Sequence, residues 1–362
     1  MNEPEMNLKG EEKTILSLRS LYASYGYQPY RMSRFEEYDL YSDNKDFLPS
    51  GNIITFTDTD GRLLALKPDV TLSIVKNLKE NRGYVNRIFY DENVYRVSDR
   101  FGTFREITQA GVECVGDIGI LELSEAAVLA QKSLKIISQD CVLMVSHMGI
   151  VEDFLKELGS EELSAKALEA LKSKNTCALE AQASEYPEKL GTFLKLEKLA
   201  MLSGDNCEIY DQLMKLGAKK EALEELKSII SVLDSSCARI DFSVLGGMKY
   251  YNGITFRGYI RGIPVPVVSG GQYDKLMKRM NRSSKAIGFA VYMDTVERMF
   301  EKPAEYDVDT VVLYKDRDSV EAVMKKTQEI RNSGKTAAAL KKIPEKLRYR
   351  EIVSMEGGNA DA

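Results

Sequence analysis

Residues 87–116 read RIFYDENVYRVSDRFGTFREITQAGVECVG, and this stretch decides the fold. Two runs of alternating apolar and polar residues flank a loop around residues 99–102, a pattern that is typical of two antiparallel strands. A period of two places Arg105, Gln109 and Glu113 on one face of the second strand. Such a face is either exposed to solvent, which the alternation alone favours, or the floor of a polar ligand site.

The segments around this hairpin extend it into a sheet interrupted by helices. Upstream, the patterns predict a helix at 8–25, a hairpin with its turn at Gly61, and a helix at 69–80 that Asp69 caps. Downstream, they predict a helix at 120–138 and a strand at 141–146. Strand patterns then return in ARIDFSVL, YYNGITFRGYI and IPVPVVSGG, and two further helices are predicted, at 273–280 and 286–300. The fold class is therefore α+β.

Two regions differ from this core. Residues 149–235 carry Leu, Ala, Lys and Glu at helical spacing, which predicts an all-helical insertion. Residues 303–362 hold one strand pattern, one helix pattern and a tail that we expect to be disordered, so they predict about half of a small α/β unit. Within this unit, residues 341–350 are basic and are interpreted as a solvated helix face. The discontinuous core then comprises residues 1–148 and 236–302.

Composition excludes several functional classes. With 50 Lys and Arg against 55 Asp and Glu, the net charge is −5, which disfavours nucleic-acid binding through the phosphate backbone. No run approaches the roughly 18 apolar residues of a membrane span, and the polar N-terminus lacks the apolar region of a secretory signal, so we expect a cytoplasmic protein. The five cysteines lie far apart, and the single histidine, His147, lies where a strand runs into a helix, so neither a metal site nor a cofactor is predicted.

Three further stretches combine strand or helix ends with polar residues. In LKPDVT, Asp69 and Thr71 could bind an ammonium group, although Asp69 could equally serve only as a helix cap. GGMKYYNG, at 246–253, pairs glycines with Tyr250 and Tyr251, and it could equally be a tight turn before a strand. SGGQYD, at 269–274, is a glycine turn that lacks the Gly-Lys-Ser/Thr ending of a P-loop.

Taken in order, these stretches resemble the catalytic core of histidyl-tRNA synthetase, a class II aminoacyl-tRNA synthetase. The resemblance runs from the first predicted helix to about residue 300. KPDVT stands where that family has Leu-Arg-Pro-Glu-Gly-Thr, and residues 95–116 match its motif 2. GGMKYYNGITF and SGGQYD match two histidine-pocket signatures, and residues 149–235 fall where the family carries its insertion domain. The resemblance implies a class II synthetase-like antiparallel sheet flanked by helices, with a truncated C-terminal unit.

The residues that the family uses to activate histidine are mostly replaced. Arg96 keeps the motif 2 arginine, but its usual glutamate companion is Ser98, and the signature arginine and aspartate are Gly246 and Lys249. The motif 3 Glu-Arg pair falls on 294–295, which is Asp-Thr; a register shifted by three residues would use 297–298 instead. Loss of cations that stabilise the developing charge on phosphate implies that no catalytic residues remain.

The groups that would hold histidine persist. The resemblance implies that Asp69 and Thr71 meet its α-amino group, with Gln109 and Glu113 nearby, and that two tyrosines bracket the imidazole. The full predicted histidine-binding set is Asp69, Thr71, Arg96, Gln109, Glu113, Tyr250 and Tyr251.

A pocket that recognises an amino acid without activating it is similar to that of the regulatory subunits of ATP phosphoribosyltransferase. That family joins a short-form catalytic subunit, usually four of each, in the first step of histidine biosynthesis. The resemblance implies that this chain activates that partner and transmits feedback inhibition by L-histidine, and no binding to tRNA is expected. A divergent histidyl-tRNA synthetase and a synthetase-like sensor of histidine or tRNA are the alternatives.

Overall fold

The computed structural model describes residues 10–48, 53–79, 83–97, 103–204, 206–245, 250–300 and 305–355. Ser98, Gly246, Lys249 and the tail expected to be disordered lie outside these residues, as do the side chains of residues 297–300. The chain divides into two compact units: Gly10–Arg298 forms one, and residues 305–355 belong to the other. The domain boundaries at 149–235 and 303–362 stay predictions, because this division does not test them.

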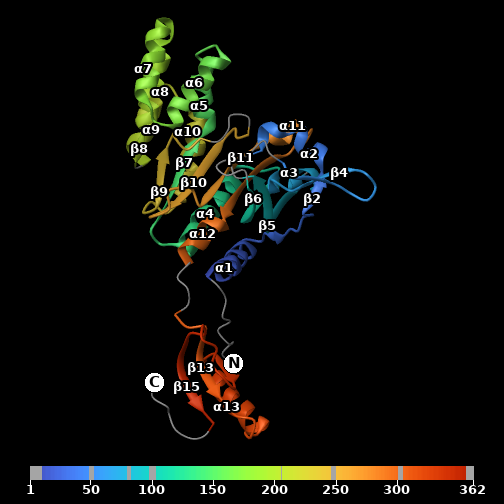
Figure 1. The fold of residues 1–362 in the computed structure, drawn as a ribbon. Coiled ribbons are helices and arrows are strands. Elements are labelled where there is room, and N and C mark those ends of the chain that lie inside the picture. Colours follow the sequence, from blue (N-terminus) through green and yellow to red (C-terminus); the bar gives the residue numbers. More distant parts are fainter. Residues whose placement is uncertain are drawn as a thin grey trace. The chain divides into compact units, whose positions relative to one another are not determined.

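A nine-stranded sheet organises the larger unit (Figure 1), in the order β1-β5-β6-β12-β11-β10-β7-β9-β8. The strands, in that order, are Gln28–Pro29, Val85–Val97, Phe104–Gly116, Lys285–Tyr292, Val268–Gln272, Ile254–Ile260, Cys141–His147, Ala238–Asp241 and Ser203–Gly204. β5 and β6 pair antiparallel along their whole length, from Val85 opposite Gly116 to Val97 opposite Phe104, which confirms the predicted hairpin. The β1–β5 and β7–β9 pairs are parallel, and the other pairs are antiparallel.

Helices lie on both faces of this sheet. In Figure 1, α1 (Gly10–Ser24) and α4 (Ile120–Ile137) lie beneath the strands, whereas α3 (Val70–Asn77) and α11 (Asp274–Arg279) lie on the other side. The packing of α4 on β10 is close: a Cβ atom at Gly258 would approach Leu134 of α4 to 2.4 Å. A larger residue at this crossing would force the buried Leu134 side chain to shift. Since alternate residues of a strand face opposite ways, Arg257 faces away from α4.

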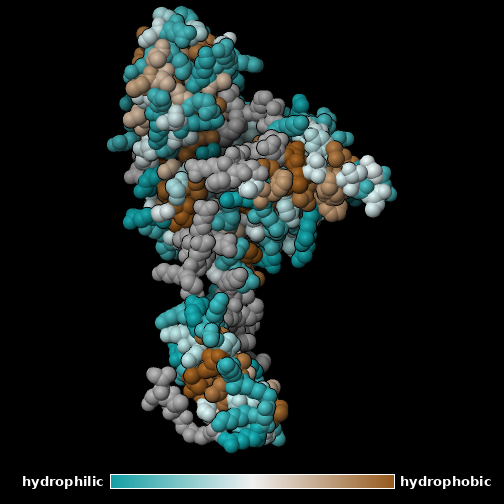
Figure 2. Space-filling view, viewed as in Figure 1, coloured by the Kyte–Doolittle hydropathy of each residue, from teal (hydrophilic) through white to brown (hydrophobic). Residues whose placement is uncertain are grey.

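A small sheet projects beside the main one and leads into α3. It contains β2 (Phe35–Glu37), β4 (Leu63–Leu66) and β3 (Thr55–Thr57), with α2 (Tyr38–Ser42) and the 3₁₀ helix η1 (Lys45–Phe47) between β2 and β3. Figure 2 shows apolar residues gathered over this part of the surface, where Phe35, Phe56 and Leu63 are exposed and the two phenylalanine rings meet edge to face at 5.7 Å. Beyond β4, Asp69 caps α3 by accepting a 2.9 Å hydrogen bond from the Leu72 amide, as the sequence predicts.

The segment between β7 and β9 is almost entirely helical, as its pattern predicts. Its elements are α5 (Met148–Lys156), α6 (Glu161–Lys172), α7 (Thr176–Glu185), η2 (Pro187–Lys189), α8 (Leu190–Met201), β8, α9 (Asn206–Leu216) and α10 (Lys220–Ser231). His147 precedes α5 and is 5% exposed, and its Nε2 atom lies 3.0 Å from Glu225 of α10. The histidine therefore ties the end of β7 to the helical segment. No helix among the described residues is long and apolar enough to cross a membrane.

The predicted helix at 286–300 is wrong in its first half. Residues 285–292 form the central strand β12, and only Met293–Phe300 is helical (α12). β12 lies between β6 and β11 in the sheet. Five of its eight residues are buried, and all five follow Lys285. A continuous apolar run has no polar face from which a period of two can be read, and it therefore resembles a buried helix.

The smaller unit is a three-stranded parallel sheet in the order β14-β13-β15 with one helix. Its elements are β13 (Val308–Leu313), α13 (Val320–Asn332), β14 (Ala337–Leu340) and β15 (Tyr349–Ser354). The sequence predicted only one of these strands, and the interpretation of residues 341–350 as a helix face is wrong. Pro344 opposes a helix there because it disrupts helical hydrogen bonding. The chain instead turns, with the Leu347 amide donating to the Pro344 carbonyl, and then enters β15.

Truncation of Leu134 tests the packing of α4 on the sheet. The side chain is fully buried, so L134A should lower the free energy of unfolding by about 2–5 kcal/mol through lost burial and a residual cavity. L121A is the matched control, because Leu121 lies on the same helix and is 68% exposed; its effect should stay within about 0.5 kcal/mol. Urea unfolding followed by circular dichroism measures both, and equal effects of the two variants would contradict this packing.

Candidate functional site

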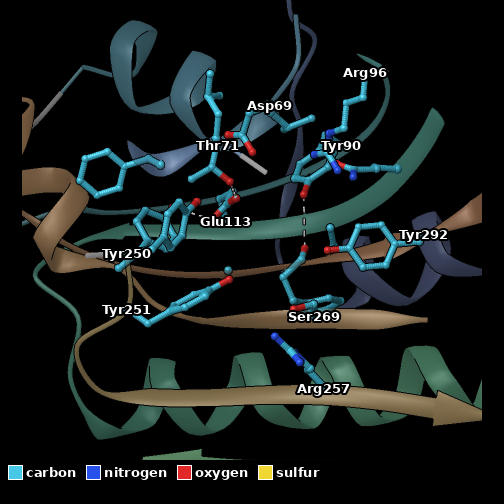
Figure 3. A pocket seen from close by; sticks show the side chains of 18 residues that line it. Asp69, Thr71, Tyr90, Arg96, Glu113, Tyr250, Tyr251, Arg257, Ser269 and Tyr292 are labelled. Carbon is cyan, nitrogen blue, oxygen red and sulfur yellow. Dashed lines mark hydrogen bonds between the residues drawn. The ribbon is translucent and has the colours of Figure 1, made fainter. Parts of the chain in front are cut away.

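A cavity of about 340 Å³ lies on the face of the main sheet opposite α4. Its wall is completed by the start of α3, the segment before β10 and the segment between β11 and α11. All seven residues of the predicted histidine-binding set line it, namely Asp69, Thr71, Arg96, Gln109, Glu113, Tyr250 and Tyr251. Residues separated by up to 180 positions in the sequence are thereby brought together, and Figure 3 shows how they converge. Whether they bind histidine stays a prediction.

Small residues on the neighbouring strands β11 and β12, namely Ser269, Gly288 and Ala290, line the floor of the cavity. The pairing register sets Ser269 of β11 opposite Ala290 of β12, and Ala290 opposite Gly111 of β6. In the adjacent row, Gly288 of β12 lies opposite Glu113 of β6. A Cβ atom at Gly288 would lie 1.8 Å from a carboxylate oxygen of Glu113. The Glu113 carboxylate can occupy this position because residue 288 has no side chain.

Glu113 is a carboxyl group buried within the sheet, with 2% of its surface exposed. The Thr71 hydroxyl donates to Oε1 at 2.8 Å, and the Tyr273 hydroxyl donates to Oε2 at 2.5 Å. Burial raises the pKa of the Glu113 carboxyl to about 8, although both hydroxyl groups counteract the shift, and the nearby Asp69 raises it further. The group can therefore present a proton donor or a negative charge to a ligand near neutral pH.

Asp69 is the second carboxylate of the site, and it is also the helix cap. Burial raises its pKa, whereas Arg96 and the amides at the start of α3 oppose the shift. Arg96 is held in place by a 2.9 Å hydrogen bond from its Nε atom to the Pro68 carbonyl. Asp69 therefore caps α3, as predicted, and also lines the cavity, whereas its contact with an ammonium group stays a prediction.

Aromatic rings form one wall. The rings of Tyr250 and Tyr251 have centroids 4.7 Å apart at an angle of 60°, and Tyr250 also lies 6.0 Å from Tyr273 and 5.9 Å from Phe47. Burial raises the pKa of each of the three tyrosines, so their hydroxyl groups stay protonated at neutral pH. A planar ring with hydrogen-bonding edges would find both stacking surfaces and donors here.

The aromatic and charged residues of the site that the sequence reasoning missed are Phe47, Tyr90, Arg257, Phe289 and Tyr292. Tyr90 lies on the hairpin, and its hydroxyl donates to the Phe289 carbonyl at 3.4 Å. Tyr292 is the last residue of β12, where the sequence pattern predicts a helix, so the side to which Tyr292 points could not be inferred. The sequence could have identified Arg257, because the alternation in YYNGITFRGYI places this residue on the face opposite Gly258.

The arrangement can recognise a small molecule with both a cationic group and an anionic group. Carboxylates and hydroxyls meet near Asp69 and Glu113, with the Arg96 guanidinium beside Asp69, and a second guanidinium, Arg257, lines the same cavity from β10. An α-amino acid with an aromatic side chain has this combination of groups. Among the residues that the structure describes, no group of three or more His, Cys, Asp or Glu side chains is placed to hold a metal ion.

Comparison with known proteins identifies the family. The model of the histidyl-tRNA synthetase family matches residues 4–296. The ATP phosphoribosyltransferase regulatory subunit of Caldanaerobacter subterraneus subsp. tengcongensis is 31% identical over 291 residues, which cover 77% of this chain and 75% of that protein. The chain therefore belongs to the histidyl-tRNA synthetase-like family that includes the ATP phosphoribosyltransferase regulatory subunits.

Solved structures agree with this assignment of the fold. A Bacillus halodurans protein described as an ATP phosphoribosyltransferase regulatory subunit/histidyl-tRNA synthetase superposes with a TM-score of 0.80 at 22% identity, over 98% of this chain and 99% of that one. A chain of the ATP phosphoribosyl transferase (HisG:HisZ) complex from Thermotoga maritima gives 0.63 at 21% identity, over 78% and 97%. The predicted class II synthetase-like fold is confirmed.

The buried Glu113 carboxyl makes stability depend on pH. Between pH 4.5 and about 8 the folded chain holds a proton that the unfolded chain has released, so the free energy of unfolding falls as the pH rises and levels off above 8. E113Q stays neutral and keeps hydrogen-bonding groups for both hydroxyls. We expect the variant to match wild type near pH 5 and to exceed its stability by about 2–4 kcal/mol at pH 8.5.

Thermal unfolding of the ligand-free chain at pH 5 and 8.5 measures this difference. E106Q is the matched control, since Glu106 is an exposed glutamate of the same strand that accepts bonds from Asn93 and Tyr95. Its stability relative to wild type should not increase with pH. An E113Q variant that is less stable than wild type at pH 8.5 would contradict the raised pKa.

Proposed function

We propose that this chain is a non-catalytic regulatory subunit of ATP phosphoribosyltransferase. It would join a separate short-form catalytic subunit, which carries out the first step of L-histidine biosynthesis, in a mixed oligomer of four subunits of each kind. The observation that supports this proposal most directly is the 31% identity to a regulatory subunit over three quarters of that protein. The transfer chemistry would lie on the partner, because no phosphoribosyl-pyrophosphate loop is recognisable in this sequence.

The effector of this subunit is L-histidine, bound in the cavity on the main sheet. The α-ammonium group would meet Asp69 and Thr71, with Gln109 and Glu113 beside them. The imidazole would lie between Tyr250 and Tyr251, whose ring centroids are 4.7 Å apart and tilted by 60°, so that the two rings form a corner. The raised pKa of Glu113 suits this role, since the group could donate to a neutral imidazole nitrogen or accept from a protonated one.

Absence of catalysis is inferred from residue types. The positions at which the synthetase family carries its activating arginine and aspartate hold Gly246 and Lys249, and position 98 holds serine. Arg96 remains, but its Nε atom is engaged by the Pro68 carbonyl. A pocket that holds an amino acid without activating it can only report its concentration. Histidine would then act by binding active and inhibited assemblies with different affinities.

The decisive experiment measures phosphoribosyl-ATP formation by the cognate short-form catalytic subunit. We expect little activity from the catalytic subunit alone, activity when this chain is added, and a decrease when L-histidine is then added. Activity that is indifferent to this chain would contradict the regulatory role. Histidine-dependent exchange of pyrophosphate into ATP would instead identify a divergent histidyl-tRNA synthetase, and tight salt-dependent tRNA binding would identify a tRNA sensor.

Asp69 provides a variant that separates activation from inhibition. D69N removes the negative charge that an ammonium group would meet, while its amide oxygen can still accept the Leu72 amide and cap α3. Loss of one charge-assisted hydrogen bond should raise the histidine concentration for half inhibition by about 10–100-fold, with activation retained. D39N changes an exposed aspartate in the first turn of α2 and should leave inhibition unchanged. Equal inhibition of D69N and wild type would place the effector elsewhere.

A further inference from the structure

Arg257 enters the cavity from the strand farthest from the two carboxylates. It lies on β10, opposite Ser269 of β11, and the row continues across the sheet to Ala290 and Gly111. The nearest residues of the row, Ser269 and Ala290, are small and leave space beside the long arginine side chain, whereas the row ends with Tyr90 of β5, which lies over Gly111. In Figure 3 the side chain rises from β10 toward Tyr251 and Ser269, into the open part of the site.

The charge of Arg257 is not neutralised within the described part of the chain. One terminal nitrogen, Nη2, donates to the Leu245 carbonyl at 3.2 Å, and no carboxylate of the described residues forms an ion pair with it. Other cations in the same core are satisfied differently. Lys67, which is fully buried, pairs with Glu92 at 2.9 Å. Arg257 is half-buried, lines the cavity and has one carbonyl partner, so most of its N–H donors are left for a ligand.

Arg257 and Glu113 are separated across the main sheet. Arg257 lies on β10 and Glu113 on β6, three strand spacings across the sheet (about 14 Å) and two residues along the strands (about 7 Å), so their backbones are about 16 Å apart. Both residues line the same cavity, so a ligand that carries an ammonium group and a carboxylate could contact both of them.

We propose that Arg257 binds the carboxylate of the amino acid held in this cavity and selects ligands that have one. This assignment rests on the proposed function, since it names a contact of the same effector. A guanidinium offers two parallel N–H donors, which match the two oxygen atoms of a carboxylate. Arg96 lies nearer Asp69, whose charge it offsets, and is therefore less available to an anion.

Titration calorimetry of the full chain with L-histidine and L-histidinol tests this contact. Histidinol keeps the imidazole and the amine but carries an alcohol in place of the carboxylate. Wild type should bind histidine about 10–100-fold more tightly than histidinol, and R257M should lose most of this preference because its histidine affinity falls by that factor. R257K, which keeps the charge without the fork, should retain part of the preference.

Controls separate this inference from the function on which it rests. R261M removes an arginine just beyond the end of β10, where Arg261 is exposed and pairs with Asp140, and should bind like wild type. Circular dichroism and thermal unfolding check that R257M is folded. Wild type that does not bind histidine would overturn both proposals. Wild type that binds histidine, with an R257M variant that still prefers histidine to histidinol, would overturn only the role of Arg257.

Discussion

A carboxyl group buried in the middle of a β-sheet is the constraint on which the rest of the site depends. Glu113 can occupy its place because the facing residue on β12 is Gly288, and because two hydroxyl groups satisfy its oxygen atoms. One of these comes from Thr71 on α3 and the other from Tyr273 before α11. A buried carboxyl without such partners would cost several kcal/mol. The positions of α3, β6 and β12 are therefore linked through one side chain.

The same arrangement defines what the cavity can recognise. Polar groups concentrate where α3 meets β6, aromatic rings stand beside them, and the floor between β6 and β11 is lined by residues too small to fill it. A ligand that filled this cavity would pack against its floor and would also neutralise the charged groups that line it. Such a site recognises its ligand through several weak contacts. A ligand that lacks one of the matching groups leaves a buried polar group of the site unpaired and therefore binds more weakly.

The sequence predicted the fold class and seven of the residues that line the cavity, but not every element around it. Asp69 and Glu113 could be found because a cap motif and a strand alternation are local signals, and the family resemblance then grouped them with the tyrosines. The sequence did not predict β12, because a strand buried on both faces lacks the alternation of apolar and polar residues. For the same reason Tyr292 could not be assigned to the site. Residues 341–350 were misread for a related reason: their charges indicate exposure, which a turn and an edge strand share with a helix.

The contributors to the cavity also explain how it could serve a partner outside it. Its carboxylates belong to α3 and β6, its aromatic wall to the segments before β10 and α11, and Arg257 to β10 itself. A ligand held at both ends fixes these elements in one relative arrangement, because displacement of any of them by an ångström weakens a hydrogen bond to a charged group. Binding energy is thereby coupled to the geometry of the sheet. Any partner that contacts one of these elements and requires a different geometry would compete with the ligand, and the competition is necessarily reciprocal.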